Sequence, residues 1–267
     1  MNTVEQNWDT HWKWEWFKNN GWDPPRFRDG YAGKSCKHYD QLLRKFGCRS
    51  VLDCSCGCGP KTIILAEMGY EVAGSDISSF AIEKANELSN RLGRALPFYR
   101  ASWEELAGAI DRRFDCVLND ALAWTPTREE LLAAARQVAE VLRDGGIVMF
   151  AAADEWNGRD PGNRERMHQA IAPTLKPYAL EGPFTKDGIR MIQVIERRLD
   201  YDCVDVTNLY VVEECGSLRI EHDHLPELFR WTWEVFEEVF RSAGFRELHS
   251  HKTSVDGQER ITNVAVK

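Results

Sequence analysis

The sequence predicts an α/β fold: a doubly wound, mostly parallel seven-stranded sheet that carries an antiparallel β insertion. Three observations lead to this prediction. Short apolar segments alternate with amphipathic helical segments between residues 50 and 153, which is typical of parallel βαβ units. After Ala153 this alternation gives way to segments with a hydrophobic period of two, as in antiparallel strands. A helical segment and two strand-like segments then complete the chain.

The elements of the α/β part follow one another in a regular order. The predicted strands are SVLDC, YEVAGSD, LPFYRA, FDCVLND and GGIVMFAAA. The helices expected between them include KTIILAEMG, AIEKANELSNRLG and the segment from Arg128 to Leu142. Valine, isoleucine and phenylalanine dominate the strands, as expected for a sheet that is buried on both faces. A helix from Trp231 to Ala243, the segment GFRELHSH and a last strand RITNVAVK would complete this core.

The insertion is expected to be an antiparallel sheet. Its strand-like segments are IRMIQVIERRLD, CVDVTNLYVVEE and SLRIEHDHL, and a short turn at Cys215-Gly216 joins the last two. One helix is predicted before them, over residues 164–175.

Charge and composition limit the classes of function. The chain has 267 residues and a formal net charge of −8, which argues against a nucleic-acid partner because such proteins usually present a basic face. No secretory signal is visible at the start. The longest apolar run, about IVMFAAA, is far shorter than the roughly 20 residues of a membrane helix. We therefore expect a cytoplasmic protein without a membrane partner, whose eight cysteines are mostly reduced thiols.

The segment VLDCSCGCGP joins the first strand of the series to its first helix, where open α/β sheets bind ligands. Three kinds of ligand site are alternatives for this segment, but for each of them the sequence lacks a residue that the site requires. A phosphate loop needs lysine directly after glycine, whereas Pro60 separates Gly59 from Lys61. A dinucleotide fingerprint needs a third glycine, where the chain has Thr62. A zinc or redox site would need a second pair of ligands, and no such pair follows the C-x-C-x-C spacing; no metal is therefore expected.

A fourth kind of site, for a nucleoside that carries a cationic group, agrees better with the residues. Asp53 lies in the loop itself, where it would repel a pyrophosphate but attract an ammonium or sulfonium group. Gly57 and Gly59 would let the backbone approach a ligand closely. Asp76 follows about 20 residues later, at the end of the second strand, where an acidic residue can bind ribose hydroxyls.

These motifs resemble those of class I S-adenosylmethionine-dependent methyltransferases. VLDCSCGCG and YEVAGSDIS are similar to the first two motifs of that superfamily, with Ser55 where glycine or alanine is usual and Cys58 where threonine or serine is frequent. RASWEEL, FDCVLNDALAW and LRDGGIVMF resemble its later motifs. KHYDQLLRKFG, ASWEEL and the antiparallel insertion are most similar to the glycine N-methyltransferase and glycine/sarcosine methyltransferase group. The resemblance implies a Rossmann-like methyltransferase fold and S-adenosylmethionine as the cofactor.

The resemblance also implies roles for individual residues. The loop from Asp53 to Gly59 would hold the methionine part of the cofactor, and Asp76 would bind the ribose. Ile77 would pack on the adenine, with Ser102 and Trp103 at its edge, and Asn119 would lie near both cofactor and substrate. The complete set of cofactor-binding residues expected on this basis is Asp53, Cys54, Ser55, Cys56, Gly57, Gly59, Asp76, Ile77, Ser102, Trp103 and Asn119.

No side chain stands out as a dedicated base. Methyl transfer from a sulfonium mainly requires alignment of the acceptor and exclusion of water. Asp120 and Tyr31 are the candidate catalytic residues, and His168 and His224 are further candidates for a base. Trp124 and His168 are expected to line the substrate pocket. Trp8, Trp12 and Trp16 would share one face of an N-terminal helix. That helix could close over a cationic substrate or simply pack against the core.

Together these inferences predict a methyltransferase that acts by in-line displacement on a small soluble acceptor, preferably an amine or amino-acid nitrogen. The alternatives are a small-molecule O- or S-methyltransferase, or a non-catalytic regulatory protein that binds S-adenosylmethionine. Whether the chain forms a homo-oligomer stays open. The expected regions are an aromatic-rich extension or lid at 1–35, a cofactor-binding core at 36–153, an antiparallel insertion on the substrate side at 154–230, and residues 231–267, which complete the core.

Overall fold

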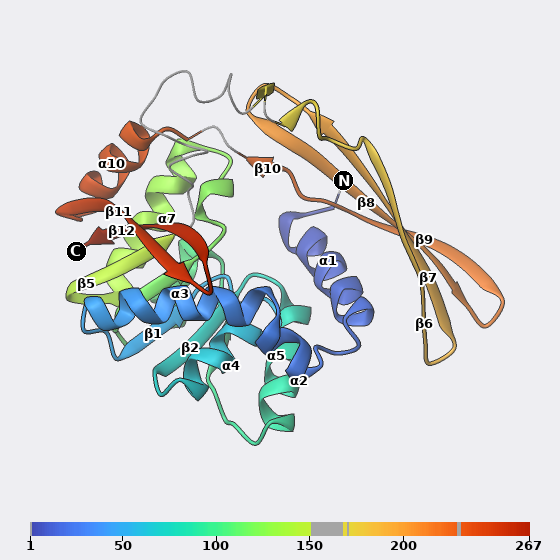
Figure 1. The fold of residues 1–267 in the computed structure, drawn as a ribbon, viewed down its shortest axis with the longest axis horizontal. Coiled ribbons are helices and arrows are strands. Elements are labelled where there is room, and N and C mark those ends of the chain that lie inside the picture. The colour runs from blue at the N-terminus through green and yellow to red at the C-terminus, as the bar shows by residue number, and fades with distance from the viewer. Residues whose placement is uncertain (1, 151–167, 170, 229–230) are drawn as a thin grey trace.

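A computed structural model describes residues 2–150, 168–169, 171–228 and 231–267. Its centre is a seven-stranded sheet with the order β11-β12-β5-β4-β1-β2-β3 (Figure 1). Strands β1 to β5 are parallel, β12 is antiparallel to β5, and β11 is antiparallel to β12. The strands are β1 (Ser50–Asp53), β2 (Glu71–Asp76), β3 (Phe98–Arg100), β4 (Phe114–Asn119), β5 (Leu142–Phe150), β11 (Glu247–Val255) and β12 (Gln258–Val266).

Helices cover both faces of this sheet, which confirms the doubly wound α/β prediction. Alternate strand residues point to opposite faces, so that Leu52 and Val117 pack in one hydrophobic cluster and Val51 and Cys116 in another. The first cluster includes residues of α6 (Leu106–Ala109), α7 (Arg128–Val141) and α10 (Trp233–Ser242). The second includes residues of α3 (Tyr31–Lys45), α4 (Pro60–Glu67) and α5 (Ser79–Arg91). Two short 3₁₀ helices, η1 (Trp103–Glu105) and η2 (Leu122–Trp124), follow strands β3 and β4.

The predicted insertion is a separate antiparallel sheet. It contains β6 (Tyr178–Lys186), β7 (Ile189–Leu199), β8 (Cys203–Glu214), β9 (Ser217–His224) and β10 (Glu227–Leu228). The hairpin turn at Cys215-Gly216 is confirmed, and both residues have positive φ angles, as a two-residue hairpin requires. The sequence did not reveal β6, because most of its residues are exposed and Gly182-Pro183 interrupts its pattern. Of the helix predicted at 164–175, residues 164–167 and 170 lie outside the described residues, whereas His168, Gln169 and Ile171 are helical and a turn follows at 172–174. The last residues of GGIVMFAAA also lie outside the described residues.

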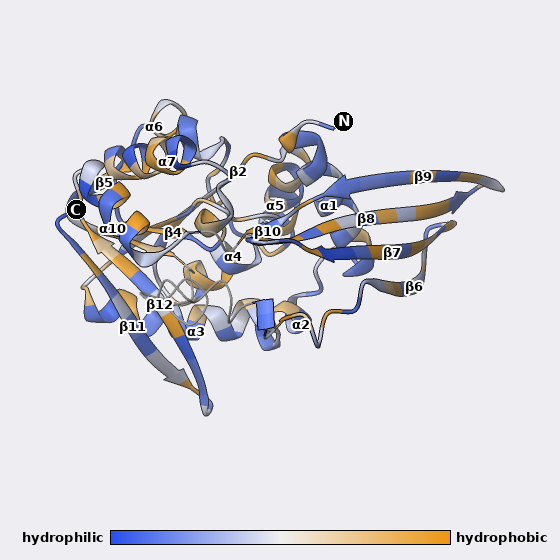
Figure 2. Ribbon diagram, turned by 90° about the horizontal axis from the view of Figure 1, so that it is seen from above, coloured by the Kyte–Doolittle hydropathy of each residue, from blue (hydrophilic) through white to orange (hydrophobic). Residues whose placement is uncertain are grey.

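Helix α1 (Val4–Lys18) lies between the core and the second sheet (Figures 1 and 2), and α2 (Pro24–Asp29) follows it. Thr3 caps α1 together with Gln6 in a capping box. Toward the second sheet, the Trp14 ring stacks on Tyr210, with ring centroids 5.6 Å apart. Toward the core, the Asp9 carboxylate accepts hydrogen bonds from Ser78 Oγ and the Phe80 N–H at the start of α5. These contacts fix α1 above the carboxyl ends of the parallel strands.

Within the described part of the chain, no helix combines the length and the apolar content that crossing a membrane requires.

Candidate active site

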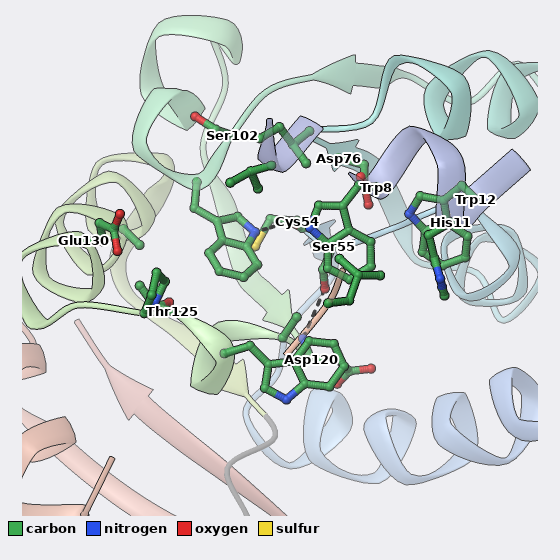
Figure 3. A pocket seen from close by; sticks show the side chains of 18 of the residues that line it. Trp8, His11, Trp12, Cys54, Ser55, Asp76, Ser102, Asp120, Thr125 and Glu130 are labelled. Carbon is green, nitrogen blue, oxygen red and sulfur yellow. Dashed lines mark hydrogen bonds between the residues drawn. The ribbon is translucent and has the colours of Figure 1, made fainter. Parts of the chain in front are cut away.

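A cavity of 630 Å³ opens where the carboxyl ends of β1, β2 and β4 meet α1 and the second sheet. Residues from both sheets and from α1 line it. Figure 3 shows Trp8, His11 and Trp12 on one side of this cavity and Thr125 and Glu130 on the other. The cavity therefore lies where doubly wound sheets bind their ligands, and it is bounded by elements that are far apart in the sequence.

Several of the predicted cofactor-binding residues line this cavity where their strands end. Trp103, at the start of η1, donates a hydrogen bond of 2.7 Å from its indole N–H to the carbonyl oxygen of Cys54. This bond ties the segment after β3 to the loop after β1. The predicted residues that line the cavity at these strand ends are Cys54, Ser55, Asp76, Ile77, Ser102 and Trp103.

Asp76 presents a buried carboxylate at the end of β2. Its Oδ2 accepts a hydrogen bond of 2.8 Å from the Gly57 N–H, and its Oδ1 accepts one of 3.0 Å from the Ser78 N–H. Burial raises the pKa of Asp76 to about 6, against the opposing effect of these two donors. The helix after it does not need this carboxylate as a cap, because Ser78 Oγ accepts from the Ala81 N–H. Asp76 is therefore available to accept hydrogen bonds from a ligand.

The remaining residues of the predicted set do not line the cavity. Asp53 is buried, and its Oδ2 accepts a hydrogen bond from Thr62 Oγ1. Asn119 is buried too, and its Oδ1 accepts from the Ala121 N–H. Cys56, Gly57 and Gly59 are likewise absent from the lining.

Close packing requires both glycines of the loop. Gly57 has a φ of +54°, and a Cβ at this position would lie 2.5 Å from the Trp12 ring. Gly59 has a φ of +85°, and its Cβ would lie 3.1 Å from both Ala85 and Phe98. Only glycine adopts such a backbone without strain. The first glycine thus lets α1 close on the loop, and the second lets α4 pack against α5 and β3.

Asp120 lines the cavity as predicted, but its surroundings oppose a role as a base. Its Oδ2 lies 2.5 Å from Lys61 Nζ, and its Oδ1 accepts a hydrogen bond from the Tyr39 hydroxyl. Arg260 Nη2 lies 3.5 Å from the same Oδ1. Although burial by itself favours the neutral acid, the charges of Lys61 and Arg260 hold the pKa of Asp120 below its ordinary value. Tyr31 also lines the cavity, and the Arg260 guanidinium lies 5.9 Å from its ring centroid.

Three tryptophans form an aromatic wall of the cavity. Trp8 stacks on Trp12, with ring centroids 6.3 Å apart, and on Trp124, with centroids 6.5 Å apart and an interplanar angle of 7°. All three line the cavity. The predicted face of α1 therefore divides: Trp8 and Trp12 reach the cavity, whereas Trp16 is buried in the core.

Two predicted histidines lie elsewhere. His168 Nε2 is 2.9 Å from the carbonyl oxygen of Tyr201, and His168 does not line the cavity. His224 Nε2 is 2.5 Å from Asp205 Oδ1 and does not line it either. Both were candidates for a base, and His168 was also expected to line the substrate pocket. His11 does line the cavity, and sequence reasoning missed it. Its spacing of three residues from Trp8 on one helix was the available signal.

The cysteine-rich loop contains no reactive thiol. All eight cysteines of the chain, each of them among the described residues, are free thiols. Cys54, Cys56 and Cys58 are buried, and burial raises the pKa of all three thiols. Within the described residues, no group of His, Cys, Asp and Glu side chains is arranged to hold a metal ion.

Comparison with known proteins agrees with this geometry. Residues 51–146 match a family described as a methyltransferase domain. The chain is 33% identical over 106 residues to the putative methyltransferase YqeM of Bacillus subtilis, an alignment that covers 38% of this chain and 40% of that protein. It is 32% identical over 184 residues to the glycine N-methyltransferase of Oryctolagus cuniculus, covering 62% of this chain and 59% of that enzyme. The chain thus spans about half the length of these curated relatives.

The fold is also found among solved structures. The sugar N-methyltransferase KedS8 of a Streptoalloteichus species superposes with a TM-score of 0.67 and 19% identity, and the alignment covers 100% of this chain and 95% of that one. The matched residues include the loop after β1 and the end of β2, which border the cavity. Residues 51–146 thus match a methyltransferase domain, and the chain shares the fold of solved S-adenosylmethionine-dependent methyltransferases.

Proposed function

We propose that the protein transfers the methyl group of S-adenosylmethionine, by in-line displacement, to the nitrogen of a small soluble amine or amino acid. One observation carries the proposal: a single cavity joins the carboxylate of Asp76 to the aromatic wall of Trp8, Trp12 and Trp124. The matches to glycine N-methyltransferases favour a nitrogen acceptor.

The strand ends fit S-adenosylmethionine. The Asp76 carboxylate borders the cavity and can accept hydrogen bonds from ribose hydroxyls. Ile77 and Trp103 offer apolar surface for an adenine ring, with Ser102 beside them. The backbone of Cys54 and Ser55, which the Trp103 indole N–H holds in place, would carry the methionine part. When bound, the cofactor supplies a methyl group that its sulfonium centre has already activated.

The chain's own residues would then bind the acceptor, orient it and exclude water. The faces of indole rings are electronegative and attract cations, so Trp8, Trp12 and Trp124 suit an amine that arrives as an ammonium ion. Val206 of β8 and Leu225, which directly follows β9, cover the cavity with apolar side chains. On this proposal, residues 36–153 and 231–267 form the cofactor-binding core, residues 154–230 cover the substrate side, and residues 1–35 act as a lid.

Calorimetry and a transfer assay test the proposal. We expect the protein to bind S-adenosylmethionine and not NAD. With methyl-labelled S-adenosylmethionine, we expect label on an amine from the panel glycine, sarcosine and glucosamine, but not on catechol or 2-mercaptoethanol. Label on catechol or the thiol alone would favour an O- or S-methyltransferase. Cofactor binding without transfer to any acceptor would favour a regulatory protein, and binding of NAD alone would refute the cofactor.

A further inference from the structure

Helix α1 brings one histidine into the cavity, between two tryptophans. The centroid of the His11 ring lies 5.5 Å from that of Trp8 and 5.3 Å from that of Trp12, and both contacts are edge-on. Its side chain is 24% exposed, and it borders the same cavity as the aromatic wall. An acceptor held against Trp8 and Trp12 would therefore lie beside this imidazole.

A buried carboxylate stands behind the histidine. Asp223 of β9 is wholly buried, and its Oδ2 lies 3.6 Å from His11 Nδ1. Its Oδ1 accepts a hydrogen bond of 2.7 Å from Asn208 Nδ2, and its Oδ2 accepts one of 2.7 Å from the Tyr210 hydroxyl. Gln193 Nε2 in turn donates to Asn208 Oδ1. The network fixes this carboxylate on the second sheet, with one oxygen turned toward α1.

The arrangement sets the orientation of the imidazole. Nδ1 of His11 is buried and makes no hydrogen bond with the described residues, so the Asp223 carboxylate is the acceptor available to it. With Nδ1 turned to Asp223, Nε2 is the nitrogen left to meet a ligand. Burial and the charge of Asp223 raise the pKa of Tyr210, so that its hydroxyl remains a donor to the carboxylate.

We propose that His11, oriented by Asp223, takes the proton of an amine that enters the cavity as an ammonium ion. This inference rests on the proposed function. An ammonium nitrogen has no lone pair and cannot attack a methyl group. Transfer of its proton to His11 Nε2 breaks an N–H bond and leaves the electron pair on nitrogen. That pair then forms the N–CH₃ bond while the C–S bond breaks and its electrons pass to sulfur. The Asp223 carboxylate stabilises the imidazolium that results.

The other charged groups near the cavity are less suited to this role. Asp120 is paired with Lys61 and Arg260. On β9, Glu221 is paired with Lys13 of α1. Asp223 is the carboxylate that lies against the His11 ring. Charged residues from other elements also line the same cavity: Lys61, Asp76, Glu104, Asp120, Glu130 and Glu227.

Three variants of the full-length protein test the His11–Asp223 pair, which we call the dyad. They are His11→Gln, Asp223→Asn and, as a matched control, His224→Gln. His224 also faces an aspartate of the second sheet, Asp205, but lies outside the cavity. The measurement is kcat/KM for the amine of the panel that accepts label, as a function of pH. At about pH 7, His11→Gln should lower kcat/KM about 100-fold, because general-base catalysis contributes on that scale. At about pH 9.5 the deficit should shrink below about fivefold, because much of the amine is then already neutral.

The other measurements distinguish a failure of the His11–Asp223 dyad from a failure of the proposed methyltransferase function. Asp223→Asn should show a deficit with the same pH dependence, and His224→Gln should match the wild type at both pH values. Calorimetry should give His11→Gln the wild-type affinity for S-adenosylmethionine. A deficit in His11→Gln that is independent of pH, or that arises from lost cofactor binding, would overturn the dyad while leaving the proposed function intact. A wild type that labels only catechol or the thiol, or labels no acceptor, would overturn both.

Discussion

Lys61 Nζ and Asp120 Oδ2 lie 2.5 Å apart on the floor of the cavity, and their side chains are only 13% and 17% exposed. Lys61 is in the first turn of α4 and Asp120 directly follows β4. Arg260 of β12 joins the pair from the C-terminal hairpin. A buried ion network therefore connects three parts of the chain at the site.

Removing one partner of this pair should destabilise the fold. Lys61→Met would leave the negative charge of Asp120 buried without the neighbouring ammonium group. We therefore expect the free energy of unfolding to fall by about 3 kcal/mol, as measured by urea denaturation. Lys252→Met is the matched control, because Lys252 pairs with Glu259 at 2.6 Å while both are about 60% exposed. Lys252→Met should lower the free energy of unfolding by less than about 1 kcal/mol. Equal losses in the two variants would contradict a buried pair.

The same pair has a predicted pH dependence. The pKa of Asp120 is lowered from 3.8 by Lys61 and Arg260 despite its burial. The stability that this carboxylate contributes is therefore complete above pH 3.8 and is lost as the pH falls through its lower folded-state value. The difference in stability between wild type and Lys61→Met should consequently shrink below that pH.

Asp76 should control affinity for S-adenosylmethionine. Asp76→Ala removes an acceptor for ribose hydroxyls, so we expect calorimetry to show binding weaker by about 1–3 kcal/mol. Because the pKa of Asp76 is raised to about 6, wild-type affinity should be constant above pH 7 and should decline as the carboxylate is protonated near pH 6. Asp115→Ala is the control. Asp115 also accepts two backbone N–H bonds, but at the opposite end of the sheet, and affinity should not change. Unchanged affinity in Asp76→Ala would remove Asp76 from the site.

Substitution by alanine should destabilise the fold more at Gly57 than at Gly47. Both have positive φ angles, +54° and +67°, so each substitution should cost about 1 kcal/mol in backbone strain. Gly47 has open space around it, whereas a Cβ at Gly57 would lie 2.5 Å from Trp12. We expect Gly57→Ala to lose about 1 kcal/mol more in urea denaturation, and this excess should vanish in a Trp12→Ala background. An excess that persists without the Trp12 ring would mean that the ring is not its cause.

The thiols of the loop should be inert. Cys56→Ala and Cys58→Ala should leave binding of S-adenosylmethionine largely unchanged, because neither side chain lines the cavity. In the native protein, iodoacetamide should modify the exposed Cys215 first, as followed by peptide mass spectrometry. The buried loop thiols, whose pKa values are raised, should react only on unfolding. Rapid native-state labelling of the loop would reopen a thiol role.

Local sequence determined the parts of this protein that depend on neighbouring residues. Hydrophobic periodicity placed the parallel strands and the helices between them, because each strand buries both faces and each helix buries one. The acid at the end of the second strand was found because its position follows from the spacing of a βαβ unit. Strand β6 escaped this reasoning because it is mostly exposed and therefore lacks the alternation that marks a half-buried strand.

Tertiary structure alone decided which polar side chains meet. Asp53 is buried beside Thr62. Asp120, a candidate catalytic residue, is surrounded by Lys61, Tyr39 and Arg260. The pairing of His11 with Asp223 joins the first helix to a strand near the other end of the chain. No local pattern encodes such contacts, because the packing of α1 between two sheets sets the distances, and burial then sets the charges.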